Sequence, residues 1–202
     1  MKSQERITVL AVIVAFSVIT LSTFIHMPTT SIPLEIIGMK YSDIVYGVFL
    51  DIFGPENIDR PIKLGMRWYN STLFMLFITG QSKYCPLPYI DYFLEYPPVV
   101  ALIMLFSTCT SFNLVLPQEY DYTTYSNLIM SVAQYHLVLN ALIILIFTLL
   151  MITYLIRLIN LLNLHDKLNR VIIMLFLPSF MIYSVYNWDI IASSLFIMSL
   201  YY

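Results

Sequence analysis

The sequence predicts an all-α integral membrane protein with about four transmembrane helices and additional juxtamembrane helices at the outer face. Two observations predict this class. Hydrophobic residues make up 59% of the 202 residues and charged residues only 11%, with a mean hydropathy of +0.80. A soluble domain has roughly 25% charged residues, so this chain lacks the polar surface to face water on all sides. The chain also contains several uncharged runs, and about 20 apolar residues suffice to cross a bilayer as a helix.

The first span is predicted within residues 1–27, over the uncharged run from Ile7 to Met27. Lys2 and Arg6 precede this run, which places the N-terminus in the cytoplasm by the positive-inside rule. A cleavable signal peptide is the alternative. The run is longer than the apolar region of a typical signal peptide and no small-residue cleavage site follows, so an anchored span is favoured.

Residues 28–130 are predicted to form a long extracytoplasmic loop with juxtamembrane helices. Short amphipathic pieces alternate there with proline and glycine breaks, and a loop of this length is usually functional. Trp68 to Gly80 is predicted to be an interfacial helix anchored by Trp68 and Tyr69. The uncharged segment 97–118 is long enough to span, but Ser107 to Ser111 and Asn113 interrupt it. We expect it to lie at the outer interface or to form a re-entrant element.

The remaining spans follow in order. Residues 131–156 are predicted to cross the membrane, and residues 157–170 form a cytoplasmic loop with three basic residues against one acid. Residues 171–202 are predicted to be a transmembrane helical hairpin of two short apolar runs, 171–186 and 190–202. A span at 97–118 would force the 157–170 loop outside, against its charge, which is a second reason to place 97–118 at the interface.

Several classes of site have no support in the sequence. The net charge of −2 gives no reason to expect a nucleic-acid partner. Sequence motifs for phosphate loops, serine hydrolases and zinc proteases are absent. Cys85 and Cys109 form no metal-ligand pattern, and free thiols are favoured over a disulfide between them. We predict no metal site and no cofactor, and leave a divalent-metal requirement open.

Three acidic positions are candidates for function. Asp43 would lie near the N-terminus of a helix beginning at Ile44, where backbone N–H groups stabilise a carboxylate; a simple helix cap is the alternative. Asp91 and Glu95 would share a face on a helical turn, among aromatic residues and before Pro97-Pro98, which fits a shaped pocket better than a solvated face. Asp189 lies between two apolar runs, either in a surface turn or as a functional acid at membrane depth.

Three motifs, read together, resemble one family. They are Tyr41-Ser42-Asp43-Ile44, Pro88-Tyr89 through Glu95-Tyr96-Pro97-Pro98, and Asn187-Trp188-Asp189. Their order and spacing are similar to the GT-C superfamily of membrane glycosyltransferases, specifically the family 87-type mannosyltransferase-like proteins. The resemblance covers nearly the whole chain and implies transfer of a hexose, such as mannose, from a polyprenyl-phosphate donor to an acceptor on the outer membrane face.

The resemblance also implies roles for individual residues. The acid after the first span is the usual general base of the family, which makes Asp43 the predicted catalytic residue. The cations Arg60, Lys63 and Arg67 are candidates to stabilise the leaving phosphate, because negative charge develops there. The remaining substrate-binding candidates shape the sugar or acceptor pocket: Tyr41, Tyr89, Asp91, Glu95, Tyr96, Asn187 and Asp189.

Members of that family have more spans than this chain, so the resemblance implies an N-terminal portion. The alternatives are a fragment, a truncated reading frame, or one half of a split enzyme whose bundle a second membrane subunit would complete. The expected partners are membrane lipid and the polyprenyl-phosphate sugar. The composition, rich in Ile, Leu and Tyr and poor in Gly, hints at the plasma membrane of an archaeon. A non-catalytic membrane subunit or scaffold is the alternative function. A transporter segment is less favoured, because the spans show no paired charges and no repeat.

Overall fold

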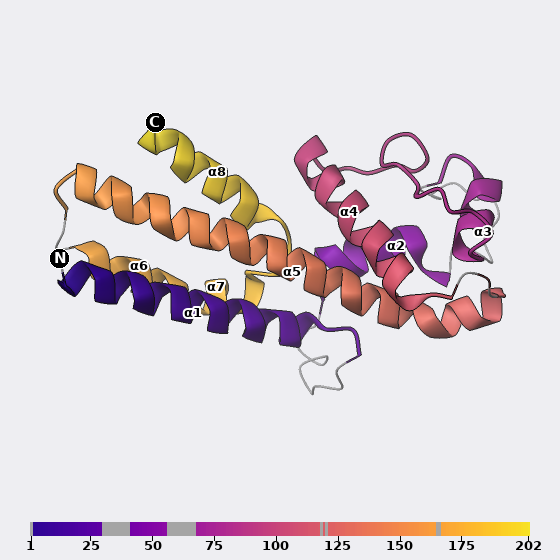
Figure 1. Cartoon of the computed structure of the whole chain (residues 1–202), viewed down its shortest axis with the longest axis horizontal. Helices are drawn as coiled ribbons and strands as arrows, with labels where there is room; N and C mark the ends of the chain where they lie inside the picture. Colours follow the sequence, from indigo (N-terminus) through magenta and orange to yellow (C-terminus); the bar gives the residue numbers. More distant parts are fainter. Residues whose placement is uncertain (1, 30–40, 56–67, 118, 120, 165–166) are drawn as a thin grey trace. The chain divides into compact units, whose positions relative to one another are not determined.

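The computed structural model describes residues 2–29, 41–55, 68–117, 119, 121–164 and 167–202. The described residues form helices joined by turns and two isolated β-bridges, with no strand among them (Figure 1). Three of the described helices are long and apolar enough to cross a membrane, over Glu5–His26, Pro98–Val115 and Thr123–Leu161. The protein is therefore an all-α membrane protein, as the composition predicted.

The two spans that the sequence identifies most clearly belong to helices α1 (Lys2–His26) and α5 (Tyr122–Leu161). Helix α1 closely matches the predicted first span. Helix α5 extends beyond the predicted 131–156 at both ends and has 40 residues. At 1.5 Å per residue it is about 60 Å long, roughly twice the thickness of the hydrocarbon core. Part of α5 must therefore project from the bilayer.

Helix α5 begins early because Asp121 caps it. One carboxylate oxygen of Asp121 accepts hydrogen bonds from the backbone N–H of Thr124 at 2.8 Å and from the hydroxyls of Thr123 and Thr124 at 2.8 and 2.7 Å. These bonds, that of the Thr124 N–H first, lower the pKa of Asp121 to about 2. Hydrogen bonds to the ionised form stabilise it, so the cap stabilises the start of α5 while Asp121 is charged.

This cap predicts an acid titration. A lowered folded-state pKa means that the stabilisation is complete above the unfolded value near 4 and is lost as the pH falls through about 2. We expect the amide proton chemical shift of Thr124 to titrate with a midpoint near pH 2, measured by NMR in detergent micelles. Asp121→Asn should abolish the titration. A wild-type midpoint near pH 4 would show that the cap does not form.

The chain divides into two compact units. The first unit contains α1, the part of α5 from Ala141 onward, α6 (Leu168–Leu175), α7 (Pro178–Tyr183) and α8 (Asp189–Tyr201). The second unit contains the π-helix η2 (Asp43–Phe49), α2 (Leu50–Phe53), α3 (Ser71–Ile78), α4 (Pro98–Val115) and the part of α5 up to Asn140.

The core of the first unit lies between α1, α5 and α6. Ala11 and Ala15, one helical turn apart, are fully buried, and small residues at this spacing let neighbouring helices approach closely. Their buried neighbours are Val14, Val18, Ile152, Ile156, Leu168, Val171 and Leu175. The other face of α1 exposes large apolar side chains, among them Val9, Ile13 and Phe16. An apolar face of this kind suits contact with lipid.

The predicted hairpin over 171–202 differs from the structure. Three short helices occupy this region, and α6 is separated from α7 at Leu177-Pro178, because proline lacks the N–H that would continue the helix. Helices α6 and α7 pack against α1. Helix α8 has 13 residues, fewer than the roughly 20 that a span requires. The short runs in the sequence therefore form a broken hairpin.

Two polar side chains of α1 satisfy backbone groups beyond this break. The Ser22 hydroxyl donates to the carbonyl of Ile182 at 2.9 Å and accepts from the N–H of Val185 at 3.1 Å. Nε2 of His26 is 2.8 Å from the same Ile182 carbonyl. Both side chains are fully buried. Because unsatisfied backbone groups are costly in a membrane, these contacts stabilise the irregular end of α7.

The core of the second unit is an aromatic cluster formed by Phe49, Phe53, Trp68, Phe74, Phe77, Tyr92, Phe112 and Tyr125. Trp68 donates from Nε1 to the carbonyl of Ile52 at 2.8 Å, and the Tyr125 hydroxyl donates to the carbonyl of Phe53. These carbonyls belong to the last turn of α2, where side chains commonly supply the hydrogen-bond partners of backbone carbonyls. The prediction that Trp68 anchors an interfacial helix is wrong, because Trp68 is 7% exposed.

Helix α4 covers most of the segment that was expected at the interface. Its Ser107 to Ser111 stretch does not break the helix, because the hydroxyls of Ser107 and Ser111 donate to carbonyls one turn earlier, at 2.9 and 2.6 Å. By length and composition α4 could also span a membrane. Its interfacial placement stays a prediction.

Candidate functional site

Asp43 begins the π-helix η2. The carbonyl of Ser42 accepts hydrogen bonds from the N–H of Tyr46 at 2.7 Å and of Gly47 at 3.3 Å, and the second has the five-residue spacing of a π-helix. Such segments are rare and frequently occur at functional sites. The side chain of Asp43 is half-buried. Its carboxylate is thus held at a helix N-terminus without being enclosed.

Two phenols lie beside this carboxylate. The Tyr96 hydroxyl donates to Oδ2 of Asp43 at 3.5 Å. A Cβ placed on Gly47 would lie 2.6 Å from the Tyr41 hydroxyl and 3.0 Å from Oδ1 of Asp43. Gly47 therefore leaves room for the oxygens of Tyr41 and Asp43 to approach one another. We call Tyr41, Asp43, Gly47 and Tyr96 the Asp43 site.

The Tyr96 phenol stays neutral at physiological pH. Burial, followed by the negative charge of Asp43 and the hydrogen bond to it, raises the pKa of Tyr96 to about 12. A neutral phenol can donate a hydrogen bond to a carboxylate, whereas a phenolate cannot. Tyr96 is therefore a hydrogen-bond donor that orients Asp43. The structure thus places two of the predicted site residues in contact.

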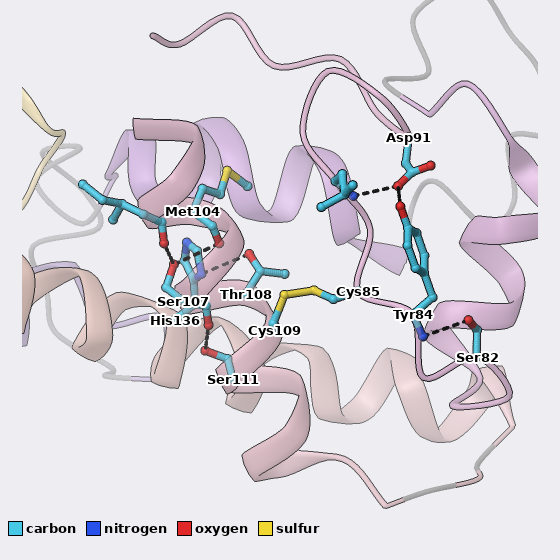
Figure 2. Close-up of a disulfide and its surroundings, with 12 residues drawn as sticks. Ser82, Tyr84, Cys85, Asp91, Met104, Ser107, Thr108, Cys109, Ser111 and His136 are labelled. Atoms are coloured by element: carbon cyan, nitrogen blue, oxygen red, sulfur yellow. Dashed lines mark hydrogen bonds between the residues drawn. A yellow bond between two sulfur atoms is a disulfide. The ribbon is translucent and has the colours of Figure 1, made fainter. Parts of the chain in front are cut away.

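Hydrogen bonds to Asp91 stabilise the loop that carries Tyr96 (Figure 2). Oδ2 of Asp91 accepts from the Tyr84 hydroxyl at 2.9 Å and from the N–H of Leu87 at 2.7 Å, and the Asp91 carbonyl accepts from the N–H of Tyr69 at 2.9 Å. The hydrogen bond to Asp91 raises the pKa of Tyr84. The side chain of Asp91 therefore holds the loop in shape.

The predicted helical turn from Asp91 to Glu95 does not form. Tyr89 adopts the left-handed backbone region with a φ of 67°, and the chain turns there before running in non-helical conformation to Pro97. Tyr92 forms isolated bridges with Trp68 and Pro88, and residues 93–95 are not helical, so the backbone after Asp91 does not form a helical turn. Glu95 is exposed and does not share a helical face with Asp91. The Tyr89 hydroxyl donates to the carbonyl of Tyr96 and so fixes the backbone of that residue.

A disulfide between Cys85 and Cys109 joins this loop to α4 (Figure 2), with 5.8 Å between the Cα atoms. The preference for free thiols was wrong. The Cα separation lies in the usual range for a disulfide, so the backbone can hold the bond. Nothing in the spacing of two cysteines shows whether they pair, because pairing depends on a contact that only the fold creates.

A polar cluster connects α4 with α5 inside the second unit. The Asn140 amide donates to the Ser107 hydroxyl at 3.0 Å, and the Thr108 hydroxyl is 3.5 Å from Nδ1 of His136. Phe49 of η2 stacks on the His136 ring, with 4.5 Å between the ring centroids. These contacts join the C-terminal end of η2 to α4 and α5. The helix that begins at Asp43 is therefore held in place at its other end.

Asn187 and Asp189 belong to the first unit. The Asn187 amide donates to Oδ2 of Asp189 at 2.8 Å, and the Asp189 N–H donates to Oδ1 of Asn187 at 3.0 Å. Together they initiate α8. The predicted cations Arg60, Lys63 and Arg67 lie outside the described residues. Within the described ranges, no group of three His, Cys, Asp or Glu side chains could hold a metal ion.

Sequence reasoning missed Gly47 and favoured free thiols over the disulfide that the structure shows. Gly47 follows Asp43 at a spacing of four residues, which puts the two on one face of a helix. That spacing could have identified Gly47 as a neighbour of Asp43 from the sequence alone. Comparison of the chain with models of known protein families, with curated proteins and with solved structures gave no match.

Proposed function

We propose that this chain is a membrane glycosyltransferase, or the N-terminal part of one, that transfers a hexose such as mannose from polyprenyl phosphate to an acceptor hydroxyl on the outer membrane face. The observation that carries the proposal is the placement of Asp43. Its half-buried carboxylate stands at the N-terminus of a π-helix, beside the phenols of Tyr41 and Tyr96 and next to the bare backbone of Gly47.

Asp43 acts as the general base in this proposal. Its carboxylate takes the proton of the acceptor hydroxyl while the acceptor oxygen forms a bond to the anomeric carbon of the sugar. The bond between that carbon and the phosphate oxygen breaks, and its electron pair leaves with the polyprenyl phosphate. Attack from the opposite face inverts the anomeric configuration. Arg60, Lys63 and Arg67 remain the candidates to stabilise the leaving phosphate.

The disulfide supports the proposed location of the Asp43 site. Disulfides persist in oxidising compartments and are rare in the cytosol. Cys85 and Cys109 belong to the same compact unit as Asp43. An outer-face location for this unit agrees with the cytoplasmic N-terminus that the basic residues before α1 predict. A base at the outer bilayer surface can meet the sugar of a lipid-linked donor.

The contacts refine the predicted binding roles. Tyr41 and Tyr96 are close to the Asp43 carboxylate and can contact a bound sugar. Tyr89 and Asp91 act through the loop, because their hydrogen bonds position Tyr96 and its neighbours. Glu95 is exposed and is available to an acceptor.

The proposal can be tested in membranes that contain the expressed chain and a radiolabelled polyprenyl-phosphate hexose. The label transferred to endogenous acceptors is measured for wild type, Asp43→Asn and Asp51→Asn. Asp51 is the matched control, because it is an exposed carboxylate on the adjoining helix α2. Expression levels are compared by immunoblot.

Transfer by wild type and Asp51→Asn, but not by Asp43→Asn, would support catalysis by Asp43. Equal transfer by all three would contradict the catalytic role. No transfer by wild type would contradict activity of this chain alone and would leave two interpretations, an incomplete enzyme and the non-catalytic membrane subunit. That alternative predicts that loss of the chain destabilises a membrane partner and that Asp43→Asn has no effect on it.

Gly47→Ala offers a separate probe of the space beside Asp43. The added methyl group would lie 2.6 Å from the Tyr41 hydroxyl, which must move. Displacements of about 1 Å near a reacting group can lower rates by roughly 10²-fold, and we expect a loss of this size. Alanine favours a helix over glycine by about 1 kcal/mol, so the thermal unfolding midpoint should not fall. If Gly47→Ala transferred sugar at the wild-type rate, the space beside Gly47 would not be needed for the reaction.

A further inference from the structure

The first unit contains a pocket beside the broken hairpin, formed by other residues than the Asp43 site. Its volume is about 410 Å³, and it lies where α6, α7 and the start of α8 meet. Its lining includes the apolar side chains of Met174, Leu177 and Ile190. The lining also includes aromatic rings and polar groups: Phe180, Tyr183, Ser184, Tyr186, Asn187 and Asp189. The pocket thus offers both apolar and polar contacts to a ligand.

The charge of this pocket is negative. Among the described residues that line it, Asp189 is the only one with a formal charge. Within the described part of the chain, its carboxylate bonds to the Asn187 amide and to no cationic side chain. A carboxylate without a cation repels phosphate and other anions and attracts cations. The phosphate of a lipid-linked sugar is therefore a poor occupant of this pocket.

Two aromatic rings form walls at an angle to one another. The rings of Tyr183 and Tyr186 are nearly perpendicular, at 77°, with centroids 5.4 Å apart. The Tyr186 ring is also in edge contact with His26 of α1, at 6.0 Å, which supports its orientation. Aromatic faces attract organic cations, and sets of angled rings are the usual cage for alkylated ammonium groups. Tyr183 is 53% exposed, so one wall is accessible from outside.

Ser184 supplies an independent indication that the pocket accepts a ligand. It lines the pocket and is 2% exposed, and its hydroxyl has no hydrogen-bond partner among the residues that the structure describes. Buried polar atoms without partners are rare in native proteins and call for an explanation. A ligand with an N–H or O–H group would satisfy this hydroxyl.

We infer that this pocket binds an alkylammonium group, with Asp189 as the counter-charge and Tyr183 and Tyr186 as the cage walls. The ammonium group would lie at the Asp189 carboxylate, and its alkyl substituent would contact the apolar lining residues Met174 and Leu177. The source is either the amine headgroup of a membrane lipid or a free amphiphilic amine. This inference does not depend on the proposed transfer of a sugar, since it concerns a different unit of the chain.

Trp188 provides a reporter, because it lies between Asn187 and Asp189 in the chain and is 3% exposed. The full chain is reconstituted in bilayers with brominated phosphatidylethanolamine or brominated phosphatidylglycerol, and tryptophan quenching gives the relative affinity of each lipid. Trp188→Phe provides the background signal of Trp68. In a second arm, hexylamine is titrated into micelles of the chain and compared with hexanol, its neutral analogue.

The inference is tested with Asp189→Asn and Tyr183→Leu, and Glu5→Gln serves as the control acid on α1. Loss of the counter-charge or of one wall should lower the preference for the amine roughly fivefold to tenfold. Tyr183 is exposed, so its replacement leaves a foldable variant even if Asp189→Asn impairs α8.

Preference for phosphatidylethanolamine, lost in both variants and kept in Glu5→Gln, would support a lipid headgroup as the ligand. A saturable response to hexylamine but not to hexanol, without lipid preference and lost in both variants, would support a free amine. No preference in either arm would overturn the inference. A preference for the amine that Tyr183→Leu retains would also overturn the inference.

Discussion

Asp43→Asn is expected to lower the turnover of sugar transfer by about 10²–10⁴-fold, the usual contribution of a general base. Asparagine keeps the shape of the side chain and an oxygen that can accept from Tyr96, so the local structure should persist. The base acts only as the new bond forms, so KM for the donor should stay close to its wild-type value. Turnover and KM are both obtained by varying the concentration of a purified polyprenyl-phosphate hexose.

Asp43→Glu separates the effect of the carboxylate's charge on the transfer rate from the effect of its position. The extra methylene group retains the charge but displaces the carboxylate, so we expect a rate between those of wild type and Asp43→Asn. A rate equal to that of Asp43→Asn is consistent with a strict geometric requirement. An equal loss in Asp51→Asn would instead indicate a general effect of removing acidic charge near η2.

Removal of the disulfide is expected to destabilise the second unit by about 3.5 kcal/mol. The two cysteines are separated by 24 positions in the sequence, and the chain-entropy model gives this value for a loop of that length. The double variant Cys85→Ser/Cys109→Ser should unfold at lower temperature. Near-ultraviolet circular dichroism can follow the change, because the aromatic cluster of this unit gives a strong signal when it is packed.

Reductant provides the control for this measurement. Dithiothreitol should lower the unfolding midpoint of wild type toward that of the double variant and should leave the double variant unchanged. Equal midpoints for oxidised wild type and the double variant would contradict a stabilising disulfide. The same comparison shows whether the loop that carries Tyr96 depends on its attachment to α4.

The helices that the sequence predicted best are those for which the bilayer dictates composition. A helix that crosses hydrocarbon needs a long apolar run, so α1 and the middle of α5 could be read directly. The early start of α5 was also readable, since Asp121 precedes Thr123 and Thr124 in a capping pattern. The break before α7 had a local signal in Pro178.

The Asp43 site was only partly predictable. The position of Asp43 after the first span follows from the motif, and its place at a helix start follows from local pattern. Its contact with Tyr96 joins residues far apart in the sequence, and Tyr96 lies in a loop that turns at Tyr89 and is joined to α4 by the disulfide. Asp91 looked like a pocket residue by composition, but its hydrogen bonds to Tyr84 and Leu87 give it a structural role.

The contacts of Ser22 and His26 with the C-terminal end of α7 and with Val185 bear on how the protein is inserted into the membrane. Synthesis proceeds from the N-terminus, so α1 enters the bilayer before Ile182 and Val185 leave the ribosome. Without α1, these backbone groups would face lipid, at a cost of several kcal/mol each. The broken hairpin can therefore fold only against an α1 that is already in the membrane, which makes α1 an intramolecular template for α6 and α7, which are translated later.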